Sequence, residues 1–292
     1  MRTLTHLSLF SGIGGLDLAA EAAGFRTIGQ CEWADYPARV LAKHWPEVPL
    51  WRDIRTLTKE SFYDRTGLRT ADVVSGGFPC QPFSCAGKRR GKDDDRYLWP
   101  EMLRVIQELR PSWVVGENVA GIVGMALDQV LSDLEGQGYE ARAFVFPACA
   151  VDSPHRRDRC AIVAWNHDSQ SDWRKSFSEI ARAPKRQSPE PSGICDNVAD
   201  THDGGGSLRR DGELPAAQGS GSIWSDYGGG TPEHGGWEWW PAEPDVGRVV
   251  HGIPSRVDRL KCLGNAVVPA QFFPVFRAIA EIERSAERDA EE

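Results

Sequence analysis

Short apolar segments alternate with amphipathic helical segments over the first 165 residues, and this alternation constrains the fold more than any other feature of the chain. An apolar strand at 4–10 leads through a glycine-rich turn into a helix that stops at Gly24. The pattern continues with expected strands at 27–33, 72–77, 112–118, 140–148 and 160–165, and expected helices at 36–45, 98–111 and 126–139. Such alternation is typical of an α/β fold in which helices cover both faces of a mostly parallel sheet.

The character of the chain changes after Trp165. From about 166 to 247 the apolar periodicity disappears and Gly, Pro, Ser and Asp dominate, which predicts a small loop-rich module. Regular patterning returns in the segment 248–292, whose end is typical of a helix. We therefore expect a first domain at 1–165, a separate module at 166–247, and a C-terminal segment at 248–292 that returns to the first domain.

Composition narrows the class of protein. The seven cysteines form an odd set without a close-spaced Cys-x-x-Cys pair, so we expect neither a disulfide framework nor a zinc or other metal site. No stretch approaches the roughly 20 apolar residues of a membrane span, so we expect a cytoplasmic protein. The net charge of −8 argues against binding polyanions by bulk charge, but the basic clusters at 88–92 and 155–159 supply local positive charge.

The turn "FSGIGG" at 10–15 places bare backbone at a helix N-terminus, where α/β folds accept a nucleotide-like ligand. Asp17 stands where a dinucleotide fingerprint would have its third glycine, which disfavours NAD. Glu32 ends the second strand, where a carboxylate can accept both hydroxyls of a ribose, and Trp33 can stack on a purine. Asp53 follows a short strand and could receive an adenine amino group. The alternative for each acid is a solvated strand end.

A single cysteine, Cys80, lies between two prolines in the stretch "GGFPCQPFS" at 76–84. Prolines restrict φ and glycines allow close backbone approach, so this turn would hold the thiol in one direction. The stretch follows the expected strand at 72–77, and open α/β sheets place their chemistry at the carboxyl ends of strands. Cys80 is therefore a candidate nucleophile, and the alternative is a small buried hydrophobic residue.

Glu117 ends the next strand, so we expect it beside Cys80 at the same edge of the sheet. A partly buried carboxyl there would have a raised pKa suited to donating a proton, whereas the alternative is a surface acid. Arg157 and Arg159 alternate in "PHRRDR" at 154–159 and would point to one side of an extended segment. Their alternative is the charged start of a strand.

The motifs "SLFSGIGGLDLA", "GGFPCQPFS", "GENV", "PHRRDRCAIV" and "LGNAVVP" together resemble the ordered motifs of the DNA cytosine-5 methyltransferases of bacterial and phage type. The resemblance covers roughly residues 4–165 and 247–280. It implies a Rossmann-like sheet that binds S-adenosylmethionine within 1–165, and a target-recognition region within 166–247. It also implies methyl transfer to C5 of a cytosine flipped out of duplex DNA.

The resemblance further assigns residue roles. Cys80 would attack C6 of cytosine, Glu117 would engage N3, and Arg157 and Arg159 would orient the base and the nearby phosphate. The residues expected to contact the cofactor are Phe10, Gly12, Ile13, Gly14, Gly15, Glu32, Trp33, Asp53, Ile54, Gly77, Pro79, Leu98, Asn265 and Val267. Those expected to contact the substrate are Phe78, Gln81, Ser84, Lys88, Arg89, Asn118, Arg209 and Arg210.

One residue and one segment depart from the family pattern. His155 stands where the family usually has glutamine, and 166–247 is short and glycine-rich for a recognition domain. In that region we expect Arg209 or Arg210 to read guanine edges, and Trp239 and Trp240 to hold the module to the catalytic domain. The alternative for this region is an inert insertion.

The glycine- and charge-rich stretch 85–99, directly after the candidate nucleophile, is expected to close on DNA, with a plain solvated loop as its alternative. Two alternative functions stay open: an RNA (tRNA) cytosine-5 methyltransferase, and a DNA-binding protein whose catalysis has decayed. Duplex DNA is the expected partner, together with a cognate restriction endonuclease that acts separately, if the chain belongs to a restriction-modification system.

Overall fold

The computed structural model describes residues 2–79, 97–153, 155–166 and 255–291. All of these residues belong to one unit of the chain, which comprises 1–181 and 251–292. The expected recognition module lies outside the described residues, so its boundaries at 166 and 247 stay predictions.

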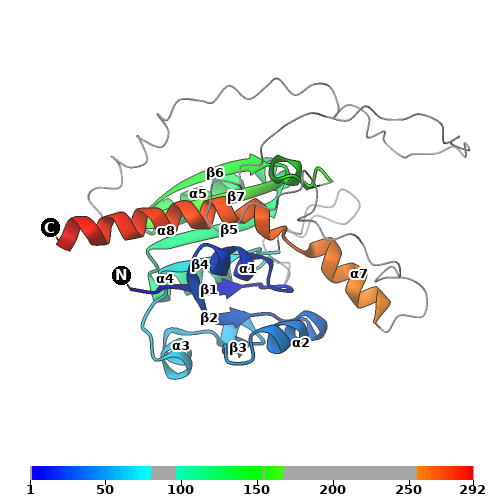
Figure 1. Ribbon diagram of the computed structural model, residues 1–292, viewed down its shortest axis with the longest axis horizontal. Coiled ribbons are helices and arrows are strands. Elements are labelled where there is room, and N and C mark those ends of the chain that lie inside the picture. The colour runs from blue at the N-terminus through cyan, green and yellow to red at the C-terminus, as the bar shows by residue number, and fades with distance from the viewer. Residues whose placement is uncertain (1, 80–96, 154, 167–254, 292) are drawn as a thin grey trace, which may run out of the picture. The chain divides into compact units, whose positions relative to one another are not determined.

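Seven strands form one sheet in the order β3-β2-β1-β4-β5-β7-β6 (Figure 1). The strands are β1 Leu4–Leu9, β2 Phe25–Cys31, β3 Leu50–Trp51, β4 Val73–Gly76, β5 Trp113–Val119, β6 Tyr139–Phe146 and β7 Arg159–Asn166. Neighbouring strands are parallel except that β7 runs antiparallel to β5 and β6. The predicted α/β alternation is thus confirmed, with a reversal at β7. Residues 147–158 connect β6 to β7 and include the short 3₁₀ helix η3, Ala148–Val151, after which β7 returns antiparallel to β6.

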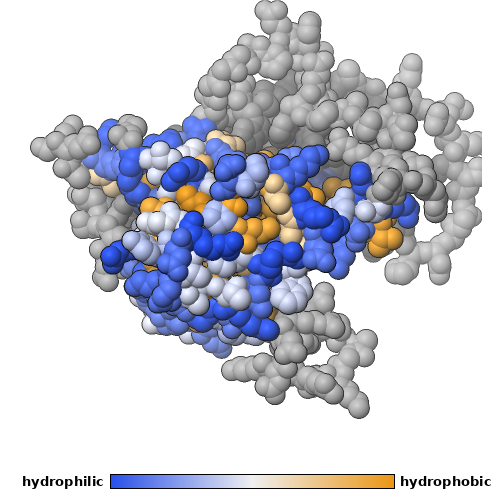
Figure 2. Space-filling view, turned by 90° about the horizontal axis from the view of Figure 1, so that it is seen from below, coloured by the Kyte–Doolittle hydropathy of each residue, from blue (hydrophilic) through white to orange (hydrophobic). Residues whose placement is uncertain are grey.

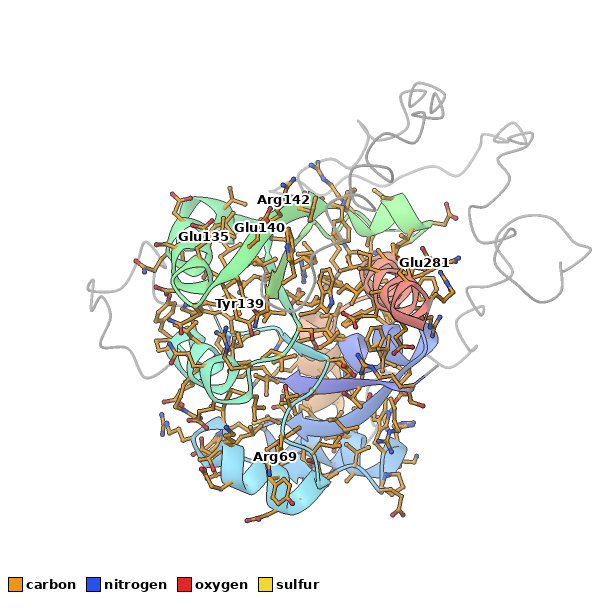
Figure 3. All side chains as sticks on the ribbon, turned by 90° about the vertical axis from the view of Figure 1, so that its left-hand side faces the viewer. Arg69, Glu135, Tyr139, Glu140, Arg142 and Glu281 are labelled. Carbon is orange, nitrogen blue, oxygen red and sulfur yellow. The ribbon has the colours of Figure 1, made fainter. Side chains whose placement is uncertain are left out.

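Helices cover both faces of the sheet, as Figure 3 shows with the sheet seen edge-on. On one face, α1 (Gly15–Ala22) and α8 (Pro269–Glu291) bury Leu16, Ala19, Phe272 and Phe276 in one apolar cluster. On the other face, α3 (Lys59–Thr66), α4 (Trp99–Leu109) and α5 (Leu127–Glu135) contribute to a second cluster. The central strands are consequently buried on both sides, as parallel strands usually are.

The two ends of the described chain meet at α8. Trp113 at the start of β5 donates its indole N–H to Glu283 of α8 at 2.8 Å. Arg2 pairs with the same glutamate at 3.2 Å and also with Asp72, which precedes β4. The C-terminal helix is therefore fastened to the strands by buried polar contacts as well as by packing.

Two further helices lie at the margins of this sheet. Helix α2 (Asp35–His44) follows β2, and α7 (Arg256–Asn265) precedes α8. No side chain of α7 is buried, and Val257, Leu260 and Leu263 are exposed along it. On the face shown in Figure 2, small groups of apolar side chains lie among polar ones. Among the described residues no single helix is long and apolar enough to cross a bilayer, although α7 and α8 together, bent by 43°, meet the same length and composition test.

Candidate active site

Three parallel strands deliver their carboxyl ends to one edge of the sheet. Leu9 of β1 pairs with Gly76 of β4, and Gly76 pairs with Gly116 of β5. The residues that follow each strand position, namely Phe10, Gly77 and Glu117, consequently stand next to one another at this edge. This is the edge at which open α/β sheets bind ligands.

Glu117 is a buried acid whose partners are side chains. Its side chain is nearly inaccessible, and Arg159 Nε lies 2.8 Å from its Oε1 atom. A Cβ on Gly77 would lie 2.7 Å from Glu117 Oε2, so a glycine is required there to let the carboxyl approach the turn. Burial raises the pKa of Glu117, and the charges of Arg159 and Arg157 oppose that rise. The raised pKa predicted from the sequence is thus confirmed in direction.

Asn118 holds the turn that leads to the candidate nucleophile. Its Nδ2 donates to the carbonyl oxygen of Phe78 at 2.9 Å, and its Oδ1 accepts from the backbone of Val119 at 3.0 Å. Phe78 is buried against Trp99 of α4, with ring centroids 4.9 Å apart. Phe78, two residues before Cys80, is therefore held both through its carbonyl oxygen, by Asn118, and through its ring, by Trp99. The predicted substrate contacts of Asn118 and Phe78 stay predictions, while the structure gives both a role in holding the turn.

Several predicted residues lie outside the described ranges. They are Cys80, Gln81, Ser84, Lys88, Arg89, Arg209, Arg210, Trp239 and Trp240. Their roles stay predictions, and the geometry around them is known only up to Pro79, which is exposed at the end of the described turn.

The two arginines before β7 have different partners. The sequence predicted an extended segment that places both on one side, but Arg157 has a left-handed backbone with φ of 41°, and β7 begins only at Arg159. Arg159 pairs with Glu117, whereas Arg157 donates to the carbonyl oxygens of Gly264, at 2.8 Å, and Ala266. The prediction of one extended segment is wrong at Arg157, because that residue turns the chain into the strand.

Glycines in the first turn have two separate functions. A Cβ on Gly14 would lie 2.5 Å from the ring of Trp45, and one on Gly15 would lie 2.7 Å from the carbonyl oxygen of Val267. These two glycines are required by packing. A Cβ on Gly12, by contrast, would meet no described atom within 4 Å. The turn thus leaves open space beside Gly12, where a ligand can approach the backbone.

Glu32 at the end of β2 is held by backbone donors. Its Oε2 accepts from the N–H of Gly12 at 2.9 Å, and its Oε1 accepts from Ala34 at 2.8 Å. Trp33, beside it, is 72% exposed. Asp53 caps the 3₁₀ helix η1 (Ile54–Thr56) by accepting from the N–H of Arg55 at 2.9 Å. The expected strand-end acids are therefore ordered by the turns that surround them.

The other predicted cofactor residues vary in exposure. Ile54 is buried in the core, Ile13 and Leu98 are partly buried, and Asn265 is exposed at the end of α7. Val267 packs against Gly15, as described above. Within the described ranges, no group of three or more His, Cys, Asp or Glu side chains could hold a metal ion.

The sequence pattern marks Asp17 only as the residue that replaces a glycine of the dinucleotide fingerprint. In the structure it is the buried polar residue beneath the turn that carries the predicted cofactor contacts. It is fully buried in the first turn of α1 and accepts from Ser8 Oγ at 2.9 Å and from Gln30 Nε2 at 2.8 Å. Burial raises the pKa of Asp17 to about 6. Polar residues at interior positions of β1 and β2 were the available signal.

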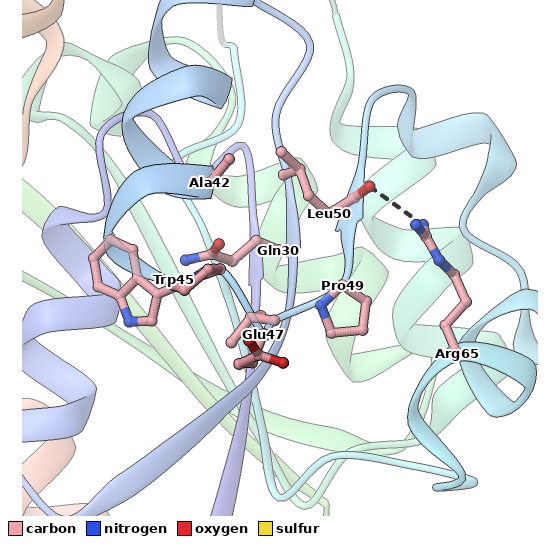
Figure 4. A pocket seen from close by; sticks show the side chains of 9 residues that line it. Gln30, Ala42, Trp45, Glu47, Pro49, Leu50 and Arg65 are labelled. Atoms are coloured by element: carbon pink, nitrogen blue, oxygen red, sulfur yellow. Dashed lines mark hydrogen bonds between the residues drawn. The ribbon is translucent and has the colours of Figure 1, made fainter.

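A surface hollow of about 490 Å³ lies between the end of α2 and the start of β3, and Gln30, the partner of Asp17, is one of its lining residues (Figure 4). Trp45, Pro49 and Arg65 line it, and Arg65 donates to the carbonyl oxygen of Leu50 at 3.2 Å. None of the residues predicted to bind cofactor or substrate lines this hollow. The hollow thus adjoins the residues that pack behind Gly14 and Asp17, but it contains none of the predicted ligand-binding residues.

A model of the C-5 cytosine-specific DNA methylase family matches residues 4–211. The chain belongs to this family. Its sheet is the Rossmann-like sheet of S-adenosylmethionine-dependent methyltransferases, with the reversed strand β7 described above. Family membership thus agrees with the motifs from which the site was predicted.

Named relatives extend this comparison. The Type II methyltransferase M.AquIA of Picosynechococcus sp. is 38% identical over 173 residues, which cover 54% of this chain and 70% of that protein. M.NgoFVII of Neisseria gonorrhoeae, also a Type II methyltransferase, is 33% identical over 173 residues, or 58% of this chain and 45% of the relative. A solved structure of a candidate DNA modification methyltransferase encoded within a prophage (E. coli) is 26% identical with a TM-score of 0.50, covering 59% of this chain and 50% of that one. The chain spans about half the length of several curated relatives that it matches.

Proposed function

We propose that this protein transfers a methyl group from S-adenosylmethionine to C5 of cytosine in duplex DNA. One observation carries the proposal: a buried carboxyl, Glu117, paired with Arg159, stands against the glycine turn that leads into Cys80. Activation of a pyrimidine ring requires a proton donor, a cation and a thiol. Glu117 and Arg159 supply the first two, and Cys80, which lies outside the described residues, is the predicted thiol.

The chemistry explains why a thiol and an acid are needed together. C5 of cytosine is a weak nucleophile until the Cys80 thiolate adds at C6 and pushes electron density toward C5 and N3. Glu117 shares its proton with N3 and so neutralises the charge that develops there. When bound, S-adenosylmethionine would supply an electrophilic methyl group to C5, with cleavage of its sulfur–methyl bond and release of S-adenosylhomocysteine. Removal of the C5 proton by a base then expels the Cys80 thiolate and restores the aromatic ring.

Arg159 orients the acid in this mechanism. Its Nε is held by Glu117 and its Nη1 donates to the carbonyl oxygen of Asp158 at 2.9 Å, so the guanidinium and the carboxyl are fixed relative to the strand. Because Glu117 is only 9% exposed, a base inside a stacked duplex cannot reach it. The target cytosine must be flipped out, at a cost of about a few kcal/mol.

The residues present on the other side of this edge fit S-adenosylmethionine. Glu32 uses one oxygen on each backbone donor, and a carboxylate has further lone pairs that can accept ribose hydroxyls. Trp33 offers an exposed ring for the adenine, and the space beside Gly12 lets a ligand approach bare backbone. Asp53 supplies the carboxylate for the adenine amino group.

A trapping experiment tests the proposed function. Duplex DNA with 5-fluorocytosine at the target, incubated with cofactor, should form a covalent adduct, because fluorine cannot leave as a cation and elimination is blocked. The Cys80→Ser variant should form none. An adduct on Cys85 would show that the thiol is assigned wrongly, and methylation of tRNA but not of duplex DNA would overturn the substrate. Cofactor binding without any methyl transfer would favour the decayed DNA-binding protein.

We also propose that the protein acts in a restriction-modification system beside a separate endonuclease. The Type II names of M.AquIA and M.NgoFVII support this. Bisulfite sequencing of DNA from expressing cells should show one methylated sequence context. Plasmid from those cells should resist an endonuclease that cuts that context, and cutting at fully methylated sites would count against the proposal.

A further inference from the structure

Arg157 holds the segment that carries two predicted cofactor residues. Its Nη2 donates to the carbonyl oxygens of Gly264 and Ala266, which flank Asn265 at the end of α7. The Arg157 Nε atom is buried and has no hydrogen-bond partner among the described residues. The guanidinium is therefore aimed at backbone carbonyls.

Gln271 holds Arg157 from the opposite side. Its side chain is 1% exposed near the start of α8, and its Nε2 donates to the carbonyl oxygens of Phe146, at 2.8 Å, and Arg157, at 3.1 Å. The second bond holds the carbonyl group of Arg157, whose positive φ of 41° is uncommon for residues other than glycine. One amide group thus joins the end of β6, the backbone two residues before β7 and the start of α8.

The segment held in this way reaches the cofactor turn. The carbonyl oxygen of Val267 lies 2.7 Å from the position of a Cβ on Gly15, at the first residue of α1. On the other side, the charge of Arg157 acts on Glu117, the acid of the base-binding half. A continuous set of contacts therefore runs from Gln271, through Arg157 and 264–267, to the turn beside the cofactor.

We propose that Arg157 and Gln271 are positioning residues that together fix 264–267 against α1, so that affinity for the cofactor depends on a residue pair located on the base-binding side. The proposal rests on the proposed function for the identity of the ligand. It assigns Arg157 a function different from that of Arg159: Arg159 orients the acid, and Arg157 shapes the cofactor site. Gln271 belongs to none of the motifs from which the site was predicted.

Arg157 and Gln271, with the backbone carbonyls that they hold, are called the clamp below. Two variants test the clamp, and a third serves as the control. Gln271→Met keeps the length of the side chain but has no donor, and Arg157→Lys keeps the charge but has no planar fork to span two carbonyls. Phe276→Leu is the matched control, because Phe276 is buried on the same helix and packs edge-on against His6 and Phe25. Thermal unfolding gives the loss of Tm of each variant, and the cofactor affinities of the clamp variants and of Phe276→Leu are compared in relation to that loss.

We expect both clamp variants to weaken binding of S-adenosylhomocysteine by about tenfold in calorimetry, which corresponds to about 1.4 kcal/mol. The double variant should be little weaker than either single one, because both changes break the same clamp. Amide hydrogen exchange at 264–267 should be faster in Gln271→Met than in Phe276→Leu. The KM for S-adenosylmethionine should rise more than kcat falls.

The outcomes separate this inference from the proposed function. If the wild type methylates cytosine but Gln271→Met binds S-adenosylhomocysteine as tightly as the wild type, the clamp is refuted and the function stands. If Phe276→Leu weakens binding as much as Gln271→Met, the effect is one of general stability and the clamp is likewise refuted. If the wild type binds S-adenosylhomocysteine but methylates no cytosine, the function falls, while weaker binding by Gln271→Met alone still supports the clamp.

Discussion

Glu32 and Glu117 each stand at the carboxyl end of a parallel strand in the same sheet, but they are held by different kinds of partner. Glu32 accepts from two backbone N–H groups and is next to the exposed ring of Trp33. Glu117 is buried, and its partner is the side chain of Arg159. A carboxylate that accepts from backbone donors keeps further lone pairs for hydroxyls, whereas burial raises the pKa of Glu117 and favours its protonated form. The first arrangement suits binding, and the second suits proton transfer.

The largest effect should come from Glu117→Gln. Glutamine keeps an oxygen for Arg159 but cannot give a proton to N3, so we expect methyl transfer to fall by about 10²–10⁴-fold. Because burial raises the pKa of Glu117, the protonated fraction of the wild type should fall as pH rises through that pKa. The kcat of the wild type should therefore fall as pH rises through this pKa, and the kcat of Glu117→Gln should not.

Measuring kcat against pH, and the affinity for S-adenosylhomocysteine of the same samples, checks both statements. The comparison between the two acids requires that cofactor affinity stay unchanged in Glu117→Gln. A variant with full activity would remove Glu117 from the mechanism. Loss of cofactor affinity would show instead that the two halves of the site are not separable.

The second largest effect concerns Asp17, a buried acid of the cofactor half whose partners are the side chains of Ser8 and Gln30. Its pKa is about 6 in the folded protein and about 3.9 in an unfolded chain, so the folded state binds more protons between these values. Stability relative to Asp17→Asn should therefore fall as pH rises from about 4 to about 6, by at most about 3 kcal/mol, and then level off.

Urea unfolding of both proteins across that pH range measures the difference. Asparagine can keep both hydrogen bonds, because the Ser8 hydroxyl can rotate, so the variant serves as the uncharged reference. A difference that does not change with pH would mean that Asp17 does not titrate on folding.

Patterns of single residue types predicted most of the fold. Alternating apolar segments predicted the α/β sheet because the buried apolar residues of strands and of helices each recur at a characteristic spacing in the sequence. The same patterns could not reveal the reversal of β7, because an apolar strand has the same periodicity in either direction. They also could not reveal the left-handed turn at Arg157, whose carbonyl oxygen accepts from Gln271, more than a hundred residues away.

Contacts between distant segments also limited prediction of the site. Glu117 and Glu32 were found because strand ends are local signals. Gln271 and Asp17 were not, because each acts through groups on other elements: backbone carbonyl oxygens for Gln271, and strand side chains for Asp17. Cys80 stays a prediction because the described turn ends at Pro79.

The next effect tests the binding half directly. Glu32→Ala removes the acceptor for ribose and also the partner of the N–H groups of Gly12 and Ala34. We expect affinity for S-adenosylhomocysteine to weaken by about 1.5–3 kcal/mol, the range of charge-assisted hydrogen bonds. Calorimetry gives this number. Unchanged affinity in a folded variant would remove Glu32 from the cofactor site and so break the comparison with Glu117.

The smallest effect should come from Arg104 of α4, which positions the turn that carries Asp53. Its guanidinium donates to the carbonyl oxygens of Ile54, at 2.8 Å, and Leu57, at 3.1 Å, at the two ends of η1. Arg104→Met would release that turn while leaving Asp53 in place. We therefore expect cofactor affinity to weaken by about 1 kcal/mol, the typical net contribution of a hydrogen bond. That loss is smaller than the one expected for Glu32→Ala.

Arg110→Met is the matched control for this last variant. Arg110 caps the opposite end of the same helix, donates to the carbonyl oxygen of Gln137 at 2.6 Å, and lies over the ring of Tyr139. It therefore makes the same kind of contact far from the strand ends. Equal weakening of S-adenosylhomocysteine binding by both variants would mean that α4 acts through overall stability. Weakening by Arg104→Met alone would show that the cofactor half, although built on backbone donors, still depends on a side chain that holds its backbone in place.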